Sequence, residues 1–145
     1  MKPIYTAQAT VTGGRDEGHG RTSDGALEVD IRVPSELGGP GEATNPEQLF
    51  AVGYASCFES ALKIVGRRQS LDVDDVSIEI RVNLLPNPDR SFALGVEMDV
   101  TLPSLQEGGA ALEVVGEAHR VCPYSNATRG NIDVAITANG QALSA

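Results

Sequence analysis

The chain of 145 residues is 41% hydrophobic and 21% charged, proportions that predict one globular domain spanning residues 1–145. Its net charge of −9 argues against nucleic-acid and anionic-membrane partners, because both bind basic surfaces. The sequence shows no N-terminal signal segment and no run of 18 apolar residues, so we expect a cytoplasmic protein without a membrane partner.

Three strands are predicted before the first helix. Alternating side-chain character indicates strands at 3–12 and Leu27–Val33, with a weaker one at Gly18–Ser23. The dipeptide Asp24-Gly25 is typical of a hairpin turn. The segment Pro34–Ala43 is rich in glycine and proline, and it predicts a loop that leads from the strands to a helix.

That helix has two equally good start signals. Thr44 and Glu47 fit a capping box, in which each side chain bonds to the backbone N–H of the other residue. Alternatively, Asn45 caps the helix and Pro46 occupies its first position. The residues alone do not choose between these two registers.

The predicted helix is apolar on nearly every face in its first turns, within the run Leu49–Val65. Gly66 is its predicted end, and Arg67 and Arg68 follow where cations favour a helix C-terminus. A helix this apolar must be buried on all sides, which the few strands of one chain can hardly achieve. The pattern therefore favours a homodimer, in which a second subunit covers the helix.

The C-terminal half predicts a hairpin, a helix and a last strand. Val76–Leu84 and Phe92–Leu102 alternate around a turn at Leu85–Arg90. An amphipathic helix weakened by glycines is predicted at Leu105–His119, and a final strand at 132–136. Because the strands come in hairpins rather than in β-α-β units, the predicted class is α+β with antiparallel sheets.

Two cysteines are the residues most able to carry chemistry, and together they suggest a dithiol–disulfide cycle. Cys57 lies inside the apolar helix, where burial raises a thiol pKa. Cys122 precedes Pro123 at the start of a short helix, whose free N–H groups favour a thiolate. Local sequence thus favours Cys122 as the nucleophile. A cation delivered to Cys57 would reverse that order, and Arg15 is the candidate, although a loop arginine is more simply a solvated charge. Two inert buried thiols are the alternative.

Two histidines, His19 and His119, complete a nominal set of two cysteines and two histidines. Their spacing fits no zinc motif, and His119 suits the last turn of a helix, where a cation is favoured. The chain also lacks a glycine-rich phosphate motif and the signatures GxSxG and HExxH. We therefore expect neither a metal nor a cofactor.

The two cysteines lie in distinctive segments. The first runs from Thr44 to Phe58 (TNPEQLFAVGYASCF), and the second from Val121 to Asn131 (VCPYSNATRGN). Both resemble the cysteine motifs of the OsmC/Ohr superfamily, and within it those of the organic hydroperoxide resistance (Ohr) proteins. The N-terminal Thr-Gly-Gly-Arg15 fits the same family, and the resemblance covers nearly the whole chain.

The resemblance implies an OsmC-like fold, with antiparallel sheets packed around a buried central helix in an intertwined homodimer. It implies a thiol peroxidase in which Cys57 attacks an organic hydroperoxide, including those of fatty acids, and Cys122 then closes a disulfide. Arg15 would hold Cys57 as a thiolate, and Glu47 would hold Arg15. A dihydrolipoyl group on a carrier protein, or another small dithiol, would restore the thiols. The resemblance thus makes Cys57 the nucleophile, whereas the local sequence favours Cys122.

An apolar wall beside Cys57 would suit an alkyl hydroperoxide better than H₂O₂. The residues expected to line it share the helix of Cys57: Leu49, Phe50, Val52 and Phe58. Two alternatives stay open. One is an OsmC-type peroxidase of broader peroxide range, and the other is a redox sensor that uses the dithiol as a switch without turnover.

Helix geometry separates two of the implied site residues. Glu47 and Cys57 are ten positions apart on one predicted helix, which places their Cα atoms about 15 Å apart along its axis. Helical side chains lean toward the N-terminus, so Glu47 leans away from Cys57. One arginine cannot bridge both within a chain. The roles fit if the Glu47 beside a given Cys57 belongs to the other subunit, which predicts composite active sites in a homodimer.

Overall fold

The computed structural model describes residues 1–144 and contains two compact units, Met1–Leu49 and a second that begins at Phe50. The first unit holds three strands and a 3₁₀ turn: β1 (Ala9–Thr12), β2 (Gly18–Thr22), β3 (Glu28–Ile31) and η1 (Ser35–Leu37). Helix α1 (Pro46–Arg68) begins there and continues through the second unit. The single domain predicted over 1–145 stays a prediction.

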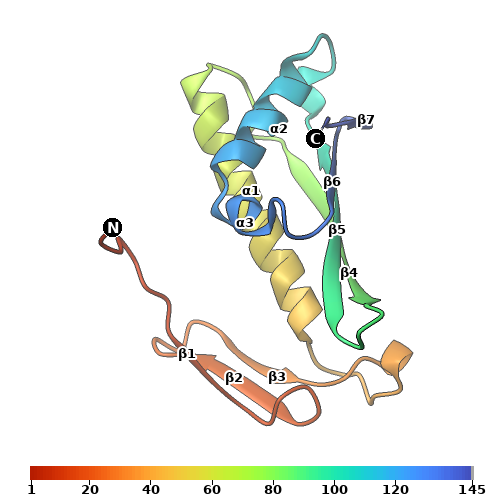
Figure 1. The fold of residues 1–145 in the computed structure, drawn as a ribbon. Helices are drawn as coiled ribbons and strands as arrows, with labels where there is room; N and C mark the ends of the chain where they lie inside the picture. The colour runs from red at the N-terminus through yellow and green to blue at the C-terminus, as the bar shows by residue number, and fades with distance from the viewer. Residues whose placement is uncertain (145) are drawn as a thin grey trace. The chain divides into compact units, whose positions relative to one another are not determined.

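The second unit holds the larger set of elements, which Figure 1 traces in chain order. They are β4 (Ser77–Pro86), β5 (Phe92–Thr101), η2 (Pro103–Leu105), α2 (Ala110–Val121), α3 (Pro123–Thr128), β6 (Val134–Ala138) and β7 (Gln141–Ala142). The hairpin and the short helix after Cys122 are confirmed. Helix α2 starts later than predicted, because Gly108 is left-handed at φ 74° and the helix begins only after Gly109.

In the first unit the strands form an antiparallel sheet in the order β1-β2-β3. The Asp24-Gly25 turn is confirmed, since Gly25 has φ 72° and Asp24 Oδ1 accepts the N–H of Ala26 at 2.9 Å. The strand predicted at 3–12 is wrong for its first half. Its pairing ends at Ala9 opposite Thr22, where β2 itself ends, so the residues before β1 have no partner strand within this unit.

The sheet of the second unit has the order β4-β5-β6-β7, and one of its pairs departs from prediction. β4–β5 and β6–β7 are antiparallel, but β5–β6 is parallel because α2 and α3 form a crossover between them. Periodicity alone cannot reveal this, since parallel and antiparallel strands share the same two-residue alternation. The short strand β7 also escaped the sequence analysis.

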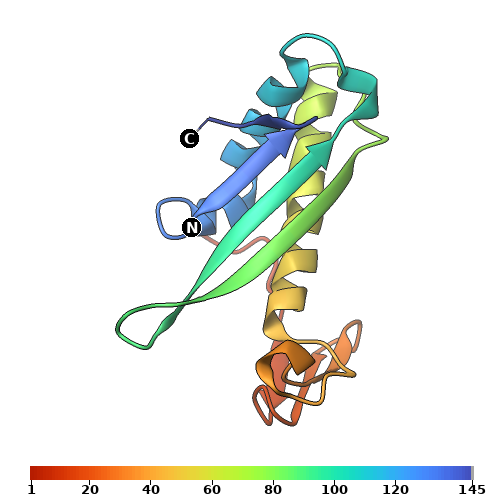
Figure 2. The ribbon, with the colours of Figure 1, turned by 90° about the vertical axis from the view of Figure 1, so that its right-hand side faces the viewer.

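Helices α1 and α2 cover one face of this sheet (Figures 1 and 2). The opposite face carries charge: Arg81 Nη2 donates to Asp99 Oδ2 at 2.8 Å across β4 and β5. Between the helices and the sheet lies a largely aliphatic core, as the scarcity of aromatic residues requires. Its largest fully buried members are Tyr54, Phe58, Leu62, Val65, Met98, Val100, Leu102, Val114, Val115 and Cys122.

The start of α1 follows the asparagine register. Asn45 Oδ1 accepts the N–H of Gln48 at 2.9 Å, and Pro46 is the first helical residue. The capping-box alternative is wrong, because Thr44 bonds to the Gln48 side chain at 3.0 Å rather than to a backbone N–H. The Glu47 carboxylate is therefore free for another partner, which matters for the site below.

The end of α1 is not at Gly66. The helix runs through Arg68, and the left-handed residue that turns the chain is Ser70, with φ 56°. Gly66 is buried inside the helix, and a Cβ there would lie 2.6 Å from Val73 Cγ2. Glycine is thus required for close packing against Val73, a tertiary reason that a local pattern cannot show.

We expect Gly66→Ala to lower the free energy of unfolding by about 1–3 kcal/mol, because Val73 is itself buried and cannot move freely away from the new methyl group. Gly116→Ala is the matched control, since it also lies inside a helix but has Leu143 Cδ1 at an ordinary 3.4 Å. There the gain in helix propensity, up to about 1 kcal/mol, should stabilise the fold. Urea denaturation measures both, and equal effects would contradict the packing argument.

By length and composition alone, α1 could cross a membrane, a test that the core helix of a soluble protein also passes. Its buried residues pack into the core of the second unit, and Lys63 pairs with Glu59 at 2.8 Å on the surface. This is the arrangement of a core helix. One chain leaves part of α1 uncovered, since Val52 is 72% exposed and Ile64 40%. That a second subunit covers this surface stays a prediction.

Candidate active site

Cys57 lies half-buried on α1, beside an aromatic cluster formed by Phe50, Tyr54 and Tyr124. The Tyr54 and Tyr124 rings are stacked at 5.6 Å, and Phe50 meets Tyr54 edge to face at 5.9 Å. Phe50 precedes Cys57 by two helical turns, so both lie on one stripe of α1. Gly53 leaves room for this contact, since a Cβ there would lie 2.8 Å from Tyr124 Oη. The cluster joins α1 to α3.

The second unit leaves Cys57 without a charged stabiliser. Burial raises the pKa of its thiol above the ordinary value, an effect that the backbone N–H of Tyr124 partly offsets by donating to the sulfur. The neighbouring Cys122 thiol raises the pKa further, which places the two side chains within interaction range. Both cysteines are free thiols. The two thiols thus lie close enough to interact, and no cation of the described residues contributes to the pKa shift of Cys57.

Cys122 is fully buried at the junction of α2 and α3. Its backbone N–H ends α2 by donating to the Ala118 carbonyl at 2.9 Å, and its own carbonyl accepts the N–H of Asn126 in α3 at 3.0 Å. The local preference for Cys122 as the nucleophile does not fit this position, because a buried sulfur cannot meet a peroxide that arrives from solvent. Cys57 is the accessible thiol of the two.

Arg15 and Glu47 form a bidentate ion pair within the first unit. The two guanidinium nitrogens donate to the two carboxylate oxygens at 2.6 and 2.9 Å. The hydrogen bonds raise the pKa of Arg15 and lower that of Glu47. A tight turn presents the arginine: Gly13 has φ 80°, and a Cβ there would overlap the Glu17 carbonyl. The local interpretation of Arg15 as a merely solvated charge is wrong.

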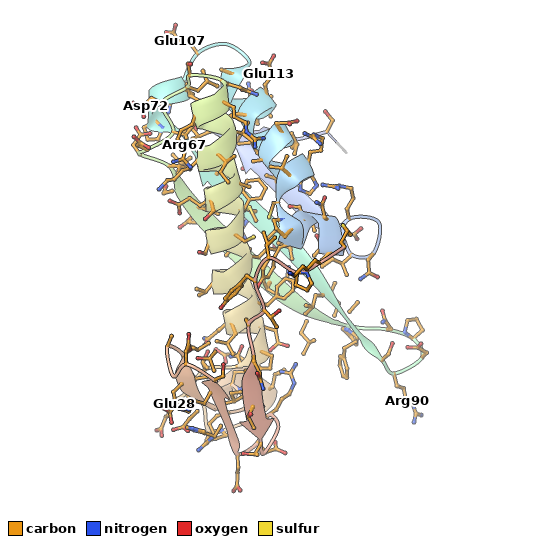
Figure 3. All side chains as sticks on the ribbon, turned by 90° about the vertical axis from the view of Figure 1, so that its left-hand side faces the viewer. Glu28, Arg67, Asp72, Arg90, Glu107 and Glu113 are labelled. Carbon is orange, nitrogen blue, oxygen red and sulfur yellow. The ribbon has the colours of Figure 1, made fainter. Side chains whose placement is uncertain are left out.

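The arginine and lysine side chains of the second unit either bond to residues other than Cys57 or lie at the ends of its elements. Arg67 lies at the C-terminal end of α1 and Arg90 at the tip of the β4–β5 hairpin (Figure 3). The others, apart from Arg68 next to Arg67, have partners: Lys63 with Glu59, Arg81 with Asp99, Arg120 with Glu117, and Arg129 with Asn126. No cation of this unit, in its described residues, contributes to the pKa shift of Cys57.

The four residues predicted to line an apolar wall are scattered around α1. Phe50 is on the Cys57 stripe and half-buried, and Leu49 is half-buried in the first unit. Val52 points outward on a different face. Phe58 is a correction, because it is fully buried in the core and cannot line an open channel. The sequence analysis missed Tyr124, which lies beside Cys57 and is 37% exposed.

The sequence analysis also missed a buried chain of hydroxyl groups. Tyr54 Oη lies 3.0 Å from Ser125 Oγ and 3.2 Å from Thr128 Oγ1, and Ser125 Oγ lies 2.9 Å from His119 Nδ1. Ser125 and Thr128 are buried on α3, and His119 is on α2. The partners are up to 74 positions apart, so no local pattern could have revealed them.

A metal site does not emerge from residues 1–144. They contain no cluster of three His, Cys, Asp or Glu side chains arranged to hold an ion. His119 bonds to Ser125, and His19 lies between Asp30 and Glu28 at 2.8 and 3.0 Å. The expected absence of a metal or cofactor stays a prediction.

The two histidines should titrate on opposite sides of pH 6.5. The Asp30 bond, and then the Glu28 bond, raise the pKa of His19, whereas burial, and then Arg129, lower that of His119. Stability from His19 is thus complete below pH 6.5 and is lost as pH rises through its raised pKa. Stability from neutral His119 is complete above pH 6.5 and is lost as pH falls through its lowered pKa.

NMR titration of the two imidazole C–H signals measures this directly. We expect one midpoint above 6.5 and one below. Asp30→Asn should bring the His19 midpoint down and leave that of His119 in place. Two midpoints at the same pH would contradict the assignment.

Comparisons with known proteins bear on these features. The family model described as OsmC-like protein matches residues 39–137. An organic hydroperoxide resistance protein of Xanthomonas axonopodis pv. citri is 49% identical over 139 residues, which are 94% of this chain and 95% of that protein. Both cysteine segments fall within the matched family region.

Solved structures agree. An organic hydroperoxide resistance protein from Legionella pneumophila is 49% identical, with a TM-score of 0.88 over 93% of this chain and 97% of that one. OhrB of Bacillus subtilis is 43% identical, with a TM-score of 0.83 over 92% of this chain and 98% of that one. The α+β class and the OsmC-like fold are confirmed. The chain belongs to the OsmC/Ohr family, within its organic hydroperoxide resistance subfamily.

Proposed function

We propose that this protein reduces organic hydroperoxides to alcohols, with Cys57 as the attacking thiol and Cys122 as the thiol that closes the disulfide. The observation that carries the proposal is the pairing of a half-exposed Cys57 with a fully buried Cys122 in interaction range. The relatives named for organic hydroperoxide resistance give the substrate class.

The chemistry balances with these two thiols alone. The Cys57 thiol takes the outer oxygen of ROOH, the O–O bond breaks, and ROH leaves with the second oxygen and a proton, so that Cys57 becomes a sulfenic acid. The Cys122 sulfur then attacks the Cys57 sulfur, which expels hydroxide, and the Cys122 proton makes it water. A dithiol such as a dihydrolipoyl group reduces the disulfide and is itself oxidised to a disulfide.

Arg15 and Glu47 supply the missing charge in this proposal. The second unit offers Cys57 no cation, and the Arg15 guanidinium is held by Glu47 of its own chain. Glu47 is about 15 Å along α1 from the Cys57 of that chain. The bound pair therefore serves the Cys57 of a second subunit, in a homodimer with two composite sites. Exposed Val52 and Ile64 on α1 supply apolar surface for such a subunit.

The substrate is apolar in this proposal. Phe50 and Tyr124 lie beside Cys57, so an alkyl chain gains contacts there that H₂O₂ lacks. The protein acts in the cytoplasm, uses no metal or cofactor, and has the peroxide, the dithiol reductant and its own second copy as partners.

Steady-state peroxide consumption tests the function. With dihydrolipoamide as reductant, a fatty-acid hydroperoxide should turn over and H₂O₂ should turn over far more slowly. A monothiol should support less turnover, because a dithiol closes its own disulfide as it leaves. Comparable rates for both peroxides would favour the OsmC-type alternative. Disulfide formation without turnover would favour the redox-sensor alternative.

A series of alkyl hydroperoxides of increasing chain length tests the expected preference for apolar substrates. Each buried CH₂ contributes about 0.8 kcal/mol, so kcat/KM should rise up to about fourfold per carbon until the apolar wall is filled. Phe50→Ala should flatten this slope, whereas Leu85→Ala, which removes an exposed apolar side chain on β4, should not. Equal kcat/KM along the series would sink the apolar-wall proposal.

A further inference from the structure

The Cys122 thiol adjoins a helix that is too short to fix its position. Helix α3 has six residues, too few to be stable by itself, and Cys122 immediately precedes it. No side chain caps its N-terminus. The position of the Cys122 sulfur must therefore be fixed by contacts between α3 and its neighbours.

Those contacts are polar and buried. Ser125 and Thr128 share one face of α3 at i and i+3, and they are 0% and 5% exposed. A buried hydroxyl without a partner is costly, so their partners determine where α3 rests. Tyr54, one helical turn before Cys57 on α1, lies 3.0 Å from Ser125 Oγ and 3.2 Å from Thr128 Oγ1.

The same helix is also fastened to the end of α2. His119 Nδ1 lies 2.9 Å from Ser125 Oγ, and the Arg129 guanidinium donates to the His119 carbonyl. Thr128 Oγ1 donates to the Ser125 carbonyl at 3.2 Å. When His119 Nδ1 donates to Ser125, Ser125 donates to Tyr54, and Tyr54 to Thr128, every proton of the chain has one acceptor.

We propose that Tyr54, Ser125, Thr128 and His119 are positioning residues for disulfide closure, holding the Cys122 helix in register with the Cys57 helix. The inference deepens the proposed function and rests on it. Tyr54 is fully buried and so does not meet substrate. Its hydroxyl links the helix of one cysteine to the helix of the other, and its loss frees α3 to move without removing either thiol.

The test separates the two chemical steps. Reduced protein is mixed with cumene hydroperoxide and quenched at intervals, and mass spectrometry follows sulfenic acid and disulfide separately. Tyr54→Phe and Thr128→Val should slow disulfide closure about tenfold, as expected for one lost hydrogen bond, and raise the fraction over-oxidised to sulfinic acid. The first step should stay within about twofold of wild type.

Matched variants guard against a general loss of structure. Thr128→Ser keeps the hydroxyl and should restore closure relative to Thr128→Val. Ser60→Ala removes an α1 hydroxyl that bonds only to the Ser56 carbonyl and should change neither step. Unchanged closure in Tyr54→Phe and Thr128→Val would overturn the inference, as would equal slowing of both steps.

A peroxide-free assay keeps the inference independent of the proposed function. Methyl methanethiosulfonate converts the Cys57 thiol into a methyl disulfide and releases methanesulfinate. Cys122 then attacks the Cys57 sulfur, which forms the protein disulfide and expels methanethiol. Tyr54→Phe and Thr128→Val should slow this closure by the same factor. If wild-type protein consumes no hydroperoxide but this difference holds, the function fails and the positioning role stands. Equal closure rates in this assay overturn the positioning role.

Discussion

Replacing Cys57 by serine should abolish hydroperoxide reduction, whereas replacing Cys122 should still allow each chain to reduce one hydroperoxide. A serine hydroxyl cannot be oxidised to a sulfenic acid equivalent, so the first step has no acceptor for the peroxide oxygen. In Cys122→Ser, Cys57 still releases one alcohol per chain, then stalls as a sulfenic acid or proceeds to sulfinic acid. Rapid quenching with mass spectrometry counts alcohol and oxidised cysteine together.

The opposite result would support the interpretation from local sequence, in which Cys122 is the nucleophile. If Cys122→Ser lost the first turnover and Cys57→Ser kept it, Cys122 would be the attacking thiol despite its burial. A small dithiol in excess serves as the control. It should rescue multiple turnovers in Cys122→Ser by reducing the sulfenic acid directly, but it should not rescue Cys57→Ser.

Mixing two inactive variants should restore activity if the sites are composite. Cys57→Ser keeps the Arg15–Glu47 pair, and Glu47→Ala keeps both thiols. A heterodimer formed by co-refolding then has one site with both defects and one with none. With random pairing, about a quarter of wild-type activity should return, since half of the dimers carry one working site out of two.

The controls show which subunit supplies the charge. Cys57→Ser mixed with Cys122→Ser should not regain disulfide formation, because in the proposed mechanism both thiols of a site come from one chain. Disulfide formation is the readout here, since a small dithiol lets Cys122→Ser turn over without it. Glu47→Ala should raise the pKa of the Cys57 thiol in an absorbance titration, as should Arg15→Ala, because each frees or removes the cation. Confirmed heterodimers without activity would mean that Glu47 acts within its own chain.

Much of the fold was readable because its causes are local. Alternating side chains predicted β4 and β5, and one of the two equally good start signals, Asn45 before Pro46, matches the start of α1. The misses have tertiary causes. Gly66 looked like a helix end but serves contact with Val73, and the chain turns instead at Ser70.

The site was readable only in part. The cysteine segments identified both thiols through a family resemblance, while local electrostatics ranked them in the opposite order. The structure adds a difference in accessibility that local sequence does not show, since Cys57 is half-buried and Cys122 is fully buried. Which of the two thiols attacks first stays a prediction. Tyr54 and Ser125 are 71 positions apart in the sequence, and neither residue type by itself predicts a hydrogen bond to so distant a partner.

The complete burial of Cys122 has a consequence for life under oxidant stress. In the proposed mechanism, a thiol without solvent exposure is shielded from oxidants in solution and reacts only after the neighbouring Cys57 has become a sulfenic acid. Over-oxidation would then fall on Cys57, the more accessible of the two thiols. The two sulfur atoms would thus differ in their exposure to oxidation: Cys57 reacts with each peroxide, whereas Cys122 is oxidised only through Cys57.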